Sequence, residues 1–310
     1  MRILVMGSGG VGGYFGGLLA KAGNEVTFVA RGEHLRAMRE RGLKVLDQGE
    51  AFMVDPTRAV ERPADADGSP DLILFTVKTY DTGPAAESIK EVVSDATAVL
   101  PLQNGIDAIQ EIGAVVGENR MLGGITNIGA QIDEPGVVNR FSPFAAVSIG
   151  EPKGGASERV RAVERVLRDA GIDVTATEDI ERALWEKFML LAPLASLTSA
   201  TNLPSGKVRS APEGKRLYLT MMREVQAVGT AAGINLPEES ATGTEKFFLS
   251  LPETHTTSLQ RDYAAERRVE VEYLAGSVVR RAKDFGVAVP SFETVYALLR
   301  TKALSFGGVS

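Results

Sequence analysis

The chain has 310 residues, of which 44% are apolar and 24% charged, and its formal net charge is −6. This length is enough for two domains with sizeable cores. There is no cysteine, which excludes disulfides, thiol nucleophiles and cysteine-ligated metals. Only two histidines are present, His34 and His255, and they leave little for a histidine metal site. We therefore expect no bound metal.

Neither half of the chain has the basic excess that is typical of nucleic-acid binding. Residues 1–175 hold 18 basic and 24 acidic side chains, and residues 176–310 hold 16 of each. The stretch MRILVMGSGG at the N-terminus has no signal-peptide pattern, and no segment reaches the roughly 18 uninterrupted apolar residues of a membrane helix. We expect a cytoplasmic protein without nucleic-acid or membrane partners. A homodimer is compatible with the sequence, which does not determine the oligomeric state.

A glycine-rich turn follows the first apolar run. Residues 2–6, RILVM, suit a buried parallel strand and lead into Gly7-Ser8-Gly9-Gly10-Val11-Gly12, a G-x-G-x-x-G. A helix over GYFGGLLAKAGNE and a strand over EVTFVAR follow, a context typical of dinucleotide-binding turns. Glycine lets the backbone approach a pyrophosphate, whose charge the helix N-terminus stabilises. We expect these six residues to bind a dinucleotide.

Four apolar strands end in residues suited to ligand binding: Gly7, Arg31, Lys78 and Asn104. Ligands of open α/β sheets bind at the carboxyl ends of the strands. At the end of the second strand Arg31 replaces the acidic residue that grips the ribose of NAD, which favours NADP(H). Arg36 or Arg39 is an alternative partner for the 2′-phosphate. Lys78 is expected to reach the cofactor, and Asn104 to face the nicotinamide or the substrate carbonyl.

The fold class expected is α/β, an N-terminal Rossmann-type doubly wound sheet followed by an all-α C-terminal domain. The strand-rich stretch from GGITNIGAQIDEPGVVNRF to AVSIGEP is expected to complete the sheet, with Ala130 among the cofactor contacts. We place the domain boundary near residue 175, giving an NADP(H)-binding domain over 1–175 and a helical substrate or catalytic domain over 176–310. The expected helices of that second domain are 179–200, 212–232, 237–250, 258–285 and 291–304.

Two charged residues stand in apolar surroundings in this helical half. Lys187 has Ala183 and Leu191 one turn away on either side, and burial lowers a lysine pKa towards the range of a general acid. Glu270 lies in ERRVEVEYLAG and would suit Lys187 as a partner. From composition alone each residue is more often a solvated or snorkelling charge.

Along nearly its whole length the chain resembles the ketopantoate reductase family, the NADPH-dependent 2-dehydropantoate 2-reductases. The matching pieces are GSGGVGG, TVK ending at Lys78, QNG holding Asn104, LWEK ending at Lys187, TSLQ containing Ser258, EVEYLAG with Glu270, and GVAVP at 286–290. The resemblance implies that NADPH reduces the 2-oxo group of ketopantoate to give pantoate for pantothenate biosynthesis.

The resemblance also implies roles for single residues. Lys187 would protonate the developing alkoxide as general acid, Ser258 would hydrogen-bond the substrate carboxylate, and Glu270 would belong to the active centre. Asn104 and Lys187 would both contact the substrate. If 258–285 is one straight helix, however, Ser258 and Glu270 lie about 18 Å apart. Both reach one small substrate only if that helix starts later or bends.

The chain departs from this family at three positions where well-known members place substrate-binding asparagines. It has Leu191, Ala195 and Ser205 there, with Asn202 near the third position but not aligned with it. Hydroxyl groups at 196, 198, 199 and 201 are alternative hydrogen-bond partners. A more apolar 2-oxo acid is therefore a rival to ketopantoate as substrate.

Other functional classes fit the residues less well. No tyrosine is followed by lysine four residues later, as short-chain dehydrogenases require, and no cysteine is available for the zinc of alcohol dehydrogenases. A β-hydroxyacid or opine-type reductase sharing the two-domain plan stays open. So does a non-catalytic NADPH-sensing protein, although a sensor has no need of both Lys187 and Glu270.

Overall fold

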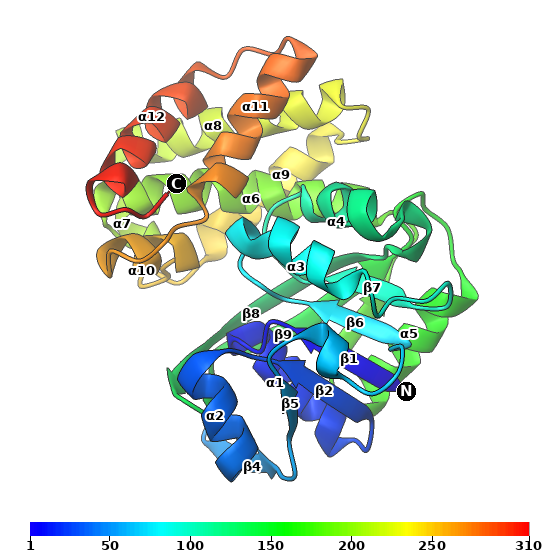
Figure 1. Ribbon diagram of the computed structural model, residues 1–310. Coiled ribbons are helices and arrows are strands. Elements are labelled where there is room, and N and C mark those ends of the chain that lie inside the picture. Colours follow the sequence, from blue (N-terminus) through cyan, green and yellow to red (C-terminus); the bar gives the residue numbers. More distant parts are fainter. Residues whose placement is uncertain (310) are drawn as a thin grey trace. The chain divides into compact units, whose positions relative to one another are not determined.

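The computed structural model describes residues 1–309 and divides into two compact units (Figure 1). Unit 1 consists of residues 1–103 and 108–180, and unit 2 of residues 104–107 and 181–309. The four-residue segment Asn104–Asp107 thus belongs to unit 2, although the chain on both sides of it belongs to unit 1. No helix described within residues 1–309 combines the length and the hydrophobicity that crossing a membrane requires.

Unit 1 contains a five-stranded, entirely parallel sheet in the order β5-β2-β1-β6-β7. Its strands are β1 (Arg2–Met6), β2 (Glu25–Val29), β5 (Arg58–Val60), β6 (Leu72–Phe75) and β7 (Ala98–Pro101). The helices that follow them are α1 (Gly10–Lys21), α2 (Gly32–Arg41), α3 (Thr82–Ile89) and α4 (Ala108–Val116). Because side chains alternate along a strand, Ile3 and Val5 enter one hydrophobic cluster while Leu4 and Met6 enter another on the opposite face. This is the doubly wound Rossmann-type arrangement that the sequence predicts.

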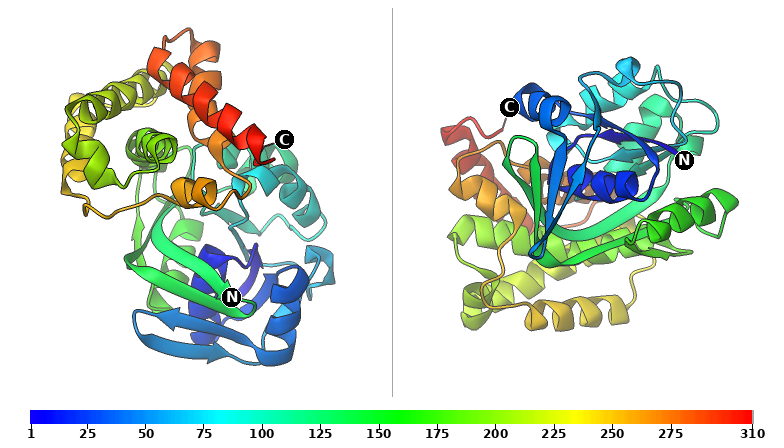
Figure 2. Two further views of the ribbon diagram at one scale, coloured as in Figure 1. Left: turned by 90° about the vertical axis from the view of Figure 1, so that its left-hand side faces the viewer. Right: turned by 90° about the horizontal axis from the view of Figure 1, so that it is seen from below.

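A second sheet in unit 1 corrects the expectation that residues 123–150 complete the parallel sheet. Its order is β10-β9-β3-β4, with β8 paired to β9. Its strands are β3 (Leu43–Asp47), β4 (Glu50–Val54), β8 (Gly123–Glu134), β9 (Val137–Gly150) and β10 (Asp173–Ala176). β8 and β9 form one long antiparallel hairpin, seen as the two long green arrows in Figure 2. A bridge between Val99 and Met121, just before β8, links the hairpin to the parallel sheet. The two strands of a hairpin run in opposite directions, so they cannot both be added to a sheet whose strands are all parallel.

The remaining elements of unit 1 are one helix and three short 3₁₀ turns. They are α5 (Glu158–Asp169), η1 (Pro63–Asp65), η2 (Thr79–Asp81) and η3 (Glu118–Arg120). α5 is the amphipathic helix that the sequence predicts after the strand-rich stretch. It buries Val160, Val163 and Leu167 in the same cluster as strands of the second sheet. The two sheets of unit 1 therefore share one continuous core with α1 and α5.

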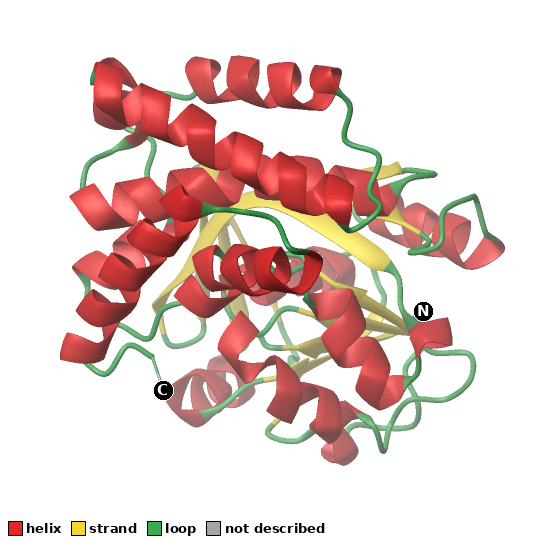
Figure 3. Ribbon diagram, turned by 90° about the horizontal axis from the view of Figure 1, so that it is seen from above, coloured by secondary structure: helices red, strands yellow, loops and turns green. Residues whose placement is uncertain are grey.

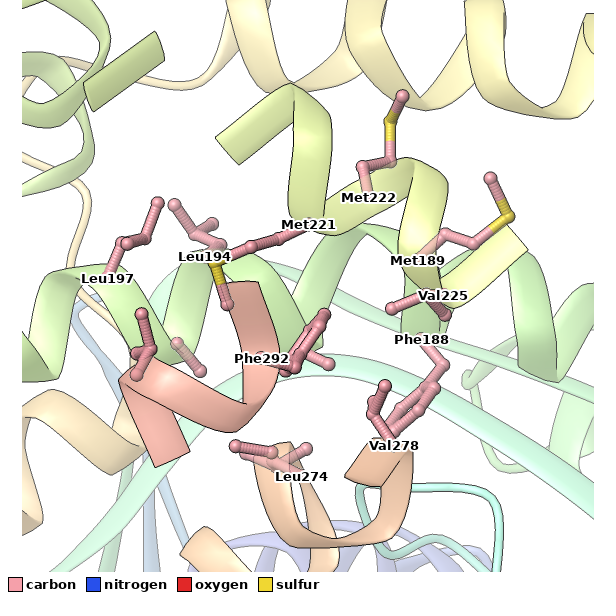
Figure 4. Packing of buried hydrophobic residues seen from close by; sticks show 14 of the residues in the cluster. Phe188, Met189, Leu194, Leu197, Met221, Met222, Val225, Leu274, Val278 and Phe292 are labelled. Carbon is pink, nitrogen blue, oxygen red and sulfur yellow. The ribbon is translucent and has the colours of Figure 1, made fainter. Parts of the chain in front are cut away.

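The regular elements of unit 2 are all helices within its described residues (Figure 3). Its helices are α6 (Ile180–Thr201), α7 (Ser205–Ser210), α8 (Pro212–Ala231), α9 (Glu238–Ser250), α10 (Ser258–Ala264), α11 (Ala275–Phe285) and α12 (Pro290–Ser305), with the 3₁₀ turn η4 (Val271–Tyr273). Four of the five predicted helices are confirmed as α6, α8, α9 and α12. Figure 4 shows the hydrophobic core of unit 2, where Phe188 of α6, Val225 of α8, Val278 of α11 and Phe292 of α12 converge. α7 was not predicted.

The prediction of one helix over 258–285 is wrong. α10 ends at Ala264, Glu266 adopts a positive φ of 50°, and the guanidinium of Arg267 turns back to Asp262 at 2.9 and 2.8 Å. The N–H of Val269 donates to the carbonyl of Gly308 at 2.9 Å, so the backbone there bonds to a distant segment instead of continuing a helix. Ser258 therefore begins one helix and Glu270 lies beyond its end. The 18 Å separation of a straight helix does not apply to them.

Candidate functional site

The glycine-rich turn lies where β1 passes into α1. Gly7 has a φ of 99°, which a residue with a side chain rarely adopts. A Cβ on Gly10 would collide with the backbone carbonyl of Ala130 on β8. Glycine at these two positions therefore allows the sharp turn and brings Ala130, predicted from the sequence as a cofactor contact, directly against it.

The start of α1 offers unpaired backbone donors. The helix has Gly9 as its N-cap residue, without a side-chain cap, and no acidic side chain in its first turn. The N–H groups of Gly10, Val11 and Gly12 have no acceptor among residues 1–309, whereas that of Gly13 bonds to Gly9. Open N–H groups at a helix N-terminus suit a phosphate group. The turn therefore fits the pyrophosphate of a dinucleotide.

Two hydroxyl groups fix the conformation of this turn through hydrogen bonds. The Ser8 hydroxyl donates to the carbonyl of Val29 on β2 at 2.9 Å, so it is bonded within unit 1 and is not open to a ligand. The Thr76 hydroxyl donates to the carbonyl of Gly7 at 2.7 Å. Sequence reasoning missed Thr76, although its place just after β6, at the same sheet edge as Gly7, was a usable signal.

The structure distinguishes the three arginines considered for the 2′-phosphate. Arg31 is exposed at the N-cap of α2, and it has no ion pair or side-chain hydrogen bond within residues 1–309. Arg36 pairs with Glu33 at 3.7 Å, and Arg39 donates to the carbonyl of Ala59 at 2.9 Å. Arg31 is therefore the one of the three whose guanidinium is available to an added anion.

Lys78 lies three residues beyond the end of β6, whereas the sequence predicts a strand that runs up to it. It is exposed and forms the N-cap residue of η2. In the sheet β6 lies beside β1, so Lys78 emerges at the same edge as the glycine-rich turn. Its predicted contact with the cofactor stays a prediction.

Unit 2 holds a compact polar cluster around Lys187. The ammonium of Lys187, on α6, donates to the side-chain oxygen of Asn104 at 3.0 Å. Glu270 is 6% exposed and close enough to influence the lysine electrostatically. The structure thus brings together the three residues that the sequence assigned to the reacting centre.

Burial sets the acidity of this lysine. Desolvation lowers the pKa of Lys187 from 10.5 to about 8, and the negative charge of Glu270 opposes that change. Burial disfavours the charged ammonium, whereas an adjacent carboxylate favours it. An ammonium with a pKa near 8 is mostly protonated at neutral pH and gives up its proton readily, as a general acid must.

A second pair, which the sequence analysis did not find, anchors the segment that carries Asn104. Asp107 accepts from both Nε and Nη2 of Arg281 on α11, at 3.0 and 2.7 Å. The guanidinium of Arg281 also lies 6.0 Å from the ring centre of Trp185 on α6. The segment Asn104–Asp107 is therefore held at both ends by unit 2. No local signal could reveal a pair separated by 174 residues.

The three departures from the family pattern differ in exposure. Ala195 and Ser205 are both 0% exposed, and the Ser205 hydroxyl donates to the carbonyl of Pro252 at 3.1 Å. Leu191 keeps some exposed surface one turn beyond Lys187. Asn202 has a positive φ of 56° just after α6, where it ends the helix. Of the three departures, only Leu191 is in a position to meet a substrate without rearrangement.

The four hydroxyl groups near the end of α6 differ in their hydrogen bonds. Three of them donate to carbonyls of their own helix: Ser196 to Ala192, Thr198 to Leu194 and Thr201 to Leu197, at 2.6 to 2.8 Å. The fourth, Ser199, is buried without a hydrogen-bond partner within residues 1–309. Ser258 is partly exposed at the first position of α10, and its role stays a prediction. Within the same residues, no group of histidine, aspartate and glutamate side chains is arranged to hold a metal ion.

Comparison with known proteins agrees with this geometry. Residues 3–154 match the model described as "Ketopantoate reductase PanE/ApbA", and residues 179–303 match its C-terminal counterpart. A 2-dehydropantoate 2-reductase from Halobacterium salinarum is 32% identical over 97% of this chain and 98% of its own length. An uncharacterized oxidoreductase from Bacillus subtilis, YkpB, is 28% identical with the same coverage. The crystal structure of a PanE/ApbA family ketopantoate reductase from Ralstonia eutropha superimposes with a TM-score of 0.90 at 28% identity, covering 99% of this chain and all of that one.

The fold and the site define an oxidoreductase with a Rossmann-type unit and a helical unit, and its cofactor is a nicotinamide dinucleotide. More specifically, the chain belongs to the ketopantoate reductase family.

Proposed function

We propose that this protein is an NADPH-dependent 2-oxo acid reductase that converts ketopantoate (2-dehydropantoate) to pantoate. The observation that carries the proposal is the cluster of Lys187, Asn104 and Glu270, in which a lysine with a pKa of about 8 is hydrogen-bonded at 3.0 Å and has a buried carboxylate nearby. In this proposal residues 1–175 bind the cofactor and residues 176–310, together with Asn104, act on the substrate. The role belongs to pantothenate biosynthesis in the cytoplasm, and a homodimer is part of the same expectation.

The proposed reaction combines a hydride and a proton at one carbonyl group. When bound, the reduced nicotinamide supplies the hydride that reaches C2 of the substrate. Lys187 gives its proton to the carbonyl oxygen, so the ketone becomes a secondary alcohol and the lysine leaves the step neutral. The ammonium also stabilises the negative charge that develops on that oxygen. Solvent then returns the proton to Lys187.

The neighbours of Lys187 have distinct tasks. Asn104 accepts one N–H of the ammonium and so orients Lys187, while its amide N–H₂ group is a donor for the substrate carbonyl. The charge of Glu270 keeps the pKa of Lys187 from falling further, which maintains the protonated form at neutral pH. Ser258 is proposed to donate a hydrogen bond to the substrate carboxylate.

Two features of unit 1 support NADPH as the proposed cofactor. The glycine-rich turn presents the unpaired N–H groups of Gly10, Val11 and Gly12, which suit the pyrophosphate. The guanidinium of Arg31 is exposed, unpaired and placed at the end of β2, where a 2′-phosphate would lie in a Rossmann-type site. The turn supports a dinucleotide of either kind, and Arg31 supports NADPH over NADH.

The deciding experiment measures NADPH oxidation by the purified protein with ketopantoate and with a panel of branched and linear 2-oxo acids. We expect a clear preference for ketopantoate. Turnover confined to another 2-oxo acid would keep the proposed chemistry and refute the substrate. Tight NADPH binding without turnover on any acid would refute the enzyme and favour a sensing role.

A further inference from the structure

The His34 imidazole joins three segments of unit 1 that are distant in the sequence. His34 lies in the first turn of α2, and its Nε2 is 2.9 Å from the carbonyl oxygen of Ser8 in the glycine-rich turn. Its Nδ1 is 3.0 Å from the backbone nitrogen of Gly136, in the turn between β8 and β9. One half-buried ring therefore connects the glycine-rich turn, the β2–α2 segment and the long hairpin.

These two contacts define the protonation state of the ring. A carbonyl oxygen only accepts, so Nε2 must carry the hydrogen that bonds to Ser8. A backbone N–H only donates, so Nδ1 must keep its lone pair for Gly136. Both bonds are satisfied by the neutral Nε2–H tautomer alone. A second proton, at Nδ1, would replace the bond to Gly136 with two opposed donors.

With the bond from His34, every polar group of Ser8 is hydrogen-bonded within unit 1. The N–H and the hydroxyl of Ser8 both donate to the carbonyl of Val29, at 3.1 and 2.9 Å, and Ser8 is 4% exposed. His34 secures the carbonyl on the other side of that residue. Shortly after Ser8, the residues Gly10 to Gly12 carry the open N–H groups proposed for the pyrophosphate. Arg31, proposed for the 2′-phosphate, lies three positions before His34 on the same segment.

We propose that His34 is a positioning residue of the dinucleotide site, whose neutral ring holds the glycine-rich turn in its binding geometry, so that protonation of the ring weakens cofactor binding. This inference rests on the proposed NADPH-binding function. It assigns His34 no contact with the cofactor and no part in the chemical step.

The surroundings of the ring favour its neutral form. Burial lowers the pKa of His34 below the ordinary 6.5, and the bond to Ser8 opposes this in part. The segments packed on the ring carry the following charged groups: Arg31, Glu33 and Arg36 around the start of α2, Arg41 at its end, and Asp133 and Glu134 beside the hairpin turn. Glu33 pairs with Arg36, and Arg41 donates to Pro135. The shift of the His34 pKa has two causes, burial and the Ser8 bond, of which burial is the larger.

The direction of the pH effect follows from the lowered pKa. Because the pKa of His34 lies below 6.5, the ring in the folded protein is mostly neutral above that pH, and the turn keeps its affinity for the cofactor. As the pH falls below 6.5 and through the pKa of His34, the protonated ring loses its bond to Gly136 and affinity declines. The cofactor's own 2′-phosphate also gains a proton in this range, so the effect of His34 must be separated by a variant that does not titrate.

The test compares NADP⁺ binding by calorimetry in four proteins between about pH 5 and pH 8. His34→Gln keeps an N–H donor for the Ser8 carbonyl and cannot titrate, whereas His34→Phe keeps the ring shape and removes both bonds. His255→Gln is the matched control, since His255 is the other histidine and lies in unit 2. Thermal melting verifies that each variant is folded. His34→Gln still decides the question if His34→Phe fails to fold.

Near pH 8 we expect His34→Phe to bind NADP⁺ about tenfold more weakly and His34→Gln to bind within a few fold of the unaltered protein. Towards pH 5 the unaltered protein and His255→Gln should lose affinity more steeply than His34→Gln. Nitrogen NMR of the cofactor-free protein, with His255→Gln leaving one histidine to observe, should show the Nε2–H tautomer. Equal pH dependence in His34→Gln and the unaltered protein, or an Nδ1–H tautomer, would overturn the inference. A protein that binds neither NADP⁺ nor NADPH at any pH would instead refute the proposed function, and this inference with it.

Discussion

The ammonium of Lys187 lies 3.0 Å from the side-chain oxygen of Asn104, although 83 positions separate the two residues in the chain. Asn104 follows the end of β7, and Lys187 lies on the first helix of unit 2. Asn104 and its three successors nevertheless belong to unit 2. A short segment after a strand of the parallel sheet is thus part of the same compact unit as the proposed proton donor. Five predictions test the roles proposed for this cluster, for the cofactor site and for substrate choice.

Removal of the proton donor should abolish most of the turnover. We expect Lys187→Ala to lower kcat by at least about 100-fold, the usual scale of general acid catalysis. Its affinity for NADPH should stay nearly unchanged, because the glycine-rich turn and Arg31, which are assigned to the phosphates of the cofactor, lie in unit 1. Lys207→Ala, which removes an exposed lysine of α7, is the control and should leave both quantities unaltered. Full turnover by Lys187→Ala would disprove the assignment.

The pH profile should report the titration of Lys187. With a pKa of about 8, the ammonium is present at neutral pH and is lost above pH 8, so kcat/KM should fall about tenfold per pH unit beyond that point. Glu270 raises the pKa of Lys187, so Glu270→Gln should move this decline to lower pH. The measurement is kcat/KM across the pH range for both proteins. A decline that stays in place, or moves to higher pH, would contradict the proposed role of Glu270.

Arg31 should determine the preference for NADPH. Loss of a charge-assisted bond to the 2′-phosphate typically costs about 1.5–3 kcal/mol, so Arg31→Ala should weaken NADPH binding about 10- to 100-fold. NADH lacks that phosphate, and its affinity should change little. Arg36→Ala is the matched control, because Arg36 pairs with Glu33 on the same helix. Equal losses for both cofactors in Arg31→Ala would place the 2′-phosphate elsewhere.

The pair of Asp107 and Arg281 should act on catalysis through Asn104. A lysine cannot reproduce the two N–H bonds that Arg281 makes to one carboxylate oxygen, so Arg281→Lys should loosen the Asn104–Asp107 segment and lower kcat/KM by about tenfold. The same substitution in an Asn104→Ala background should have little further effect. Additive losses of kcat/KM in that double-mutant cycle would show that the pair does not act through Asn104.

Leu191 should influence the choice of substrate. Because it is the one partly exposed residue of the three departures, Leu191→Asn should raise kcat/KM for ketopantoate several-fold relative to an analogue that lacks the 4-hydroxyl group. Ala195→Asn is the matched control. Ala195 is 0% exposed in the helical core, so an asparagine there should lower the melting temperature and leave selectivity unchanged. A selectivity change in Ala195→Asn alone would place the substrate deeper along α6.

Local pattern predicted most of the elements. RILVM followed by the glycine-rich turn became β1 and α1, and the apolar periodicity around Lys187 became α6. These elements could be predicted because burial imposes a repeat of two residues on a strand and of about 3.6 on a helix, whatever lies elsewhere in the chain. The prediction of one helix over 258–285 failed because the apolar periodicity continues there while the helical backbone is interrupted. Between Ala264 and Ala275 a positive φ at Glu266 and the bond from Val269 to Gly308 interrupt the helix.

The sequence by itself determined the Rossmann-type half, the helical half and the candidate residues Lys187, Glu270 and Arg31. Only the tertiary structure assigned β8 and β9 to a second sheet, bonded Lys187 to Asn104 and Asp107 to Arg281, and gave His34 a defined tautomer. The physical reason is the same in each case. Strand pairing and side-chain hydrogen bonds depend on groups that are distant in the sequence and have no periodic signal. The lowered pKa of Lys187 likewise comes from the desolvation that the folded chain imposes.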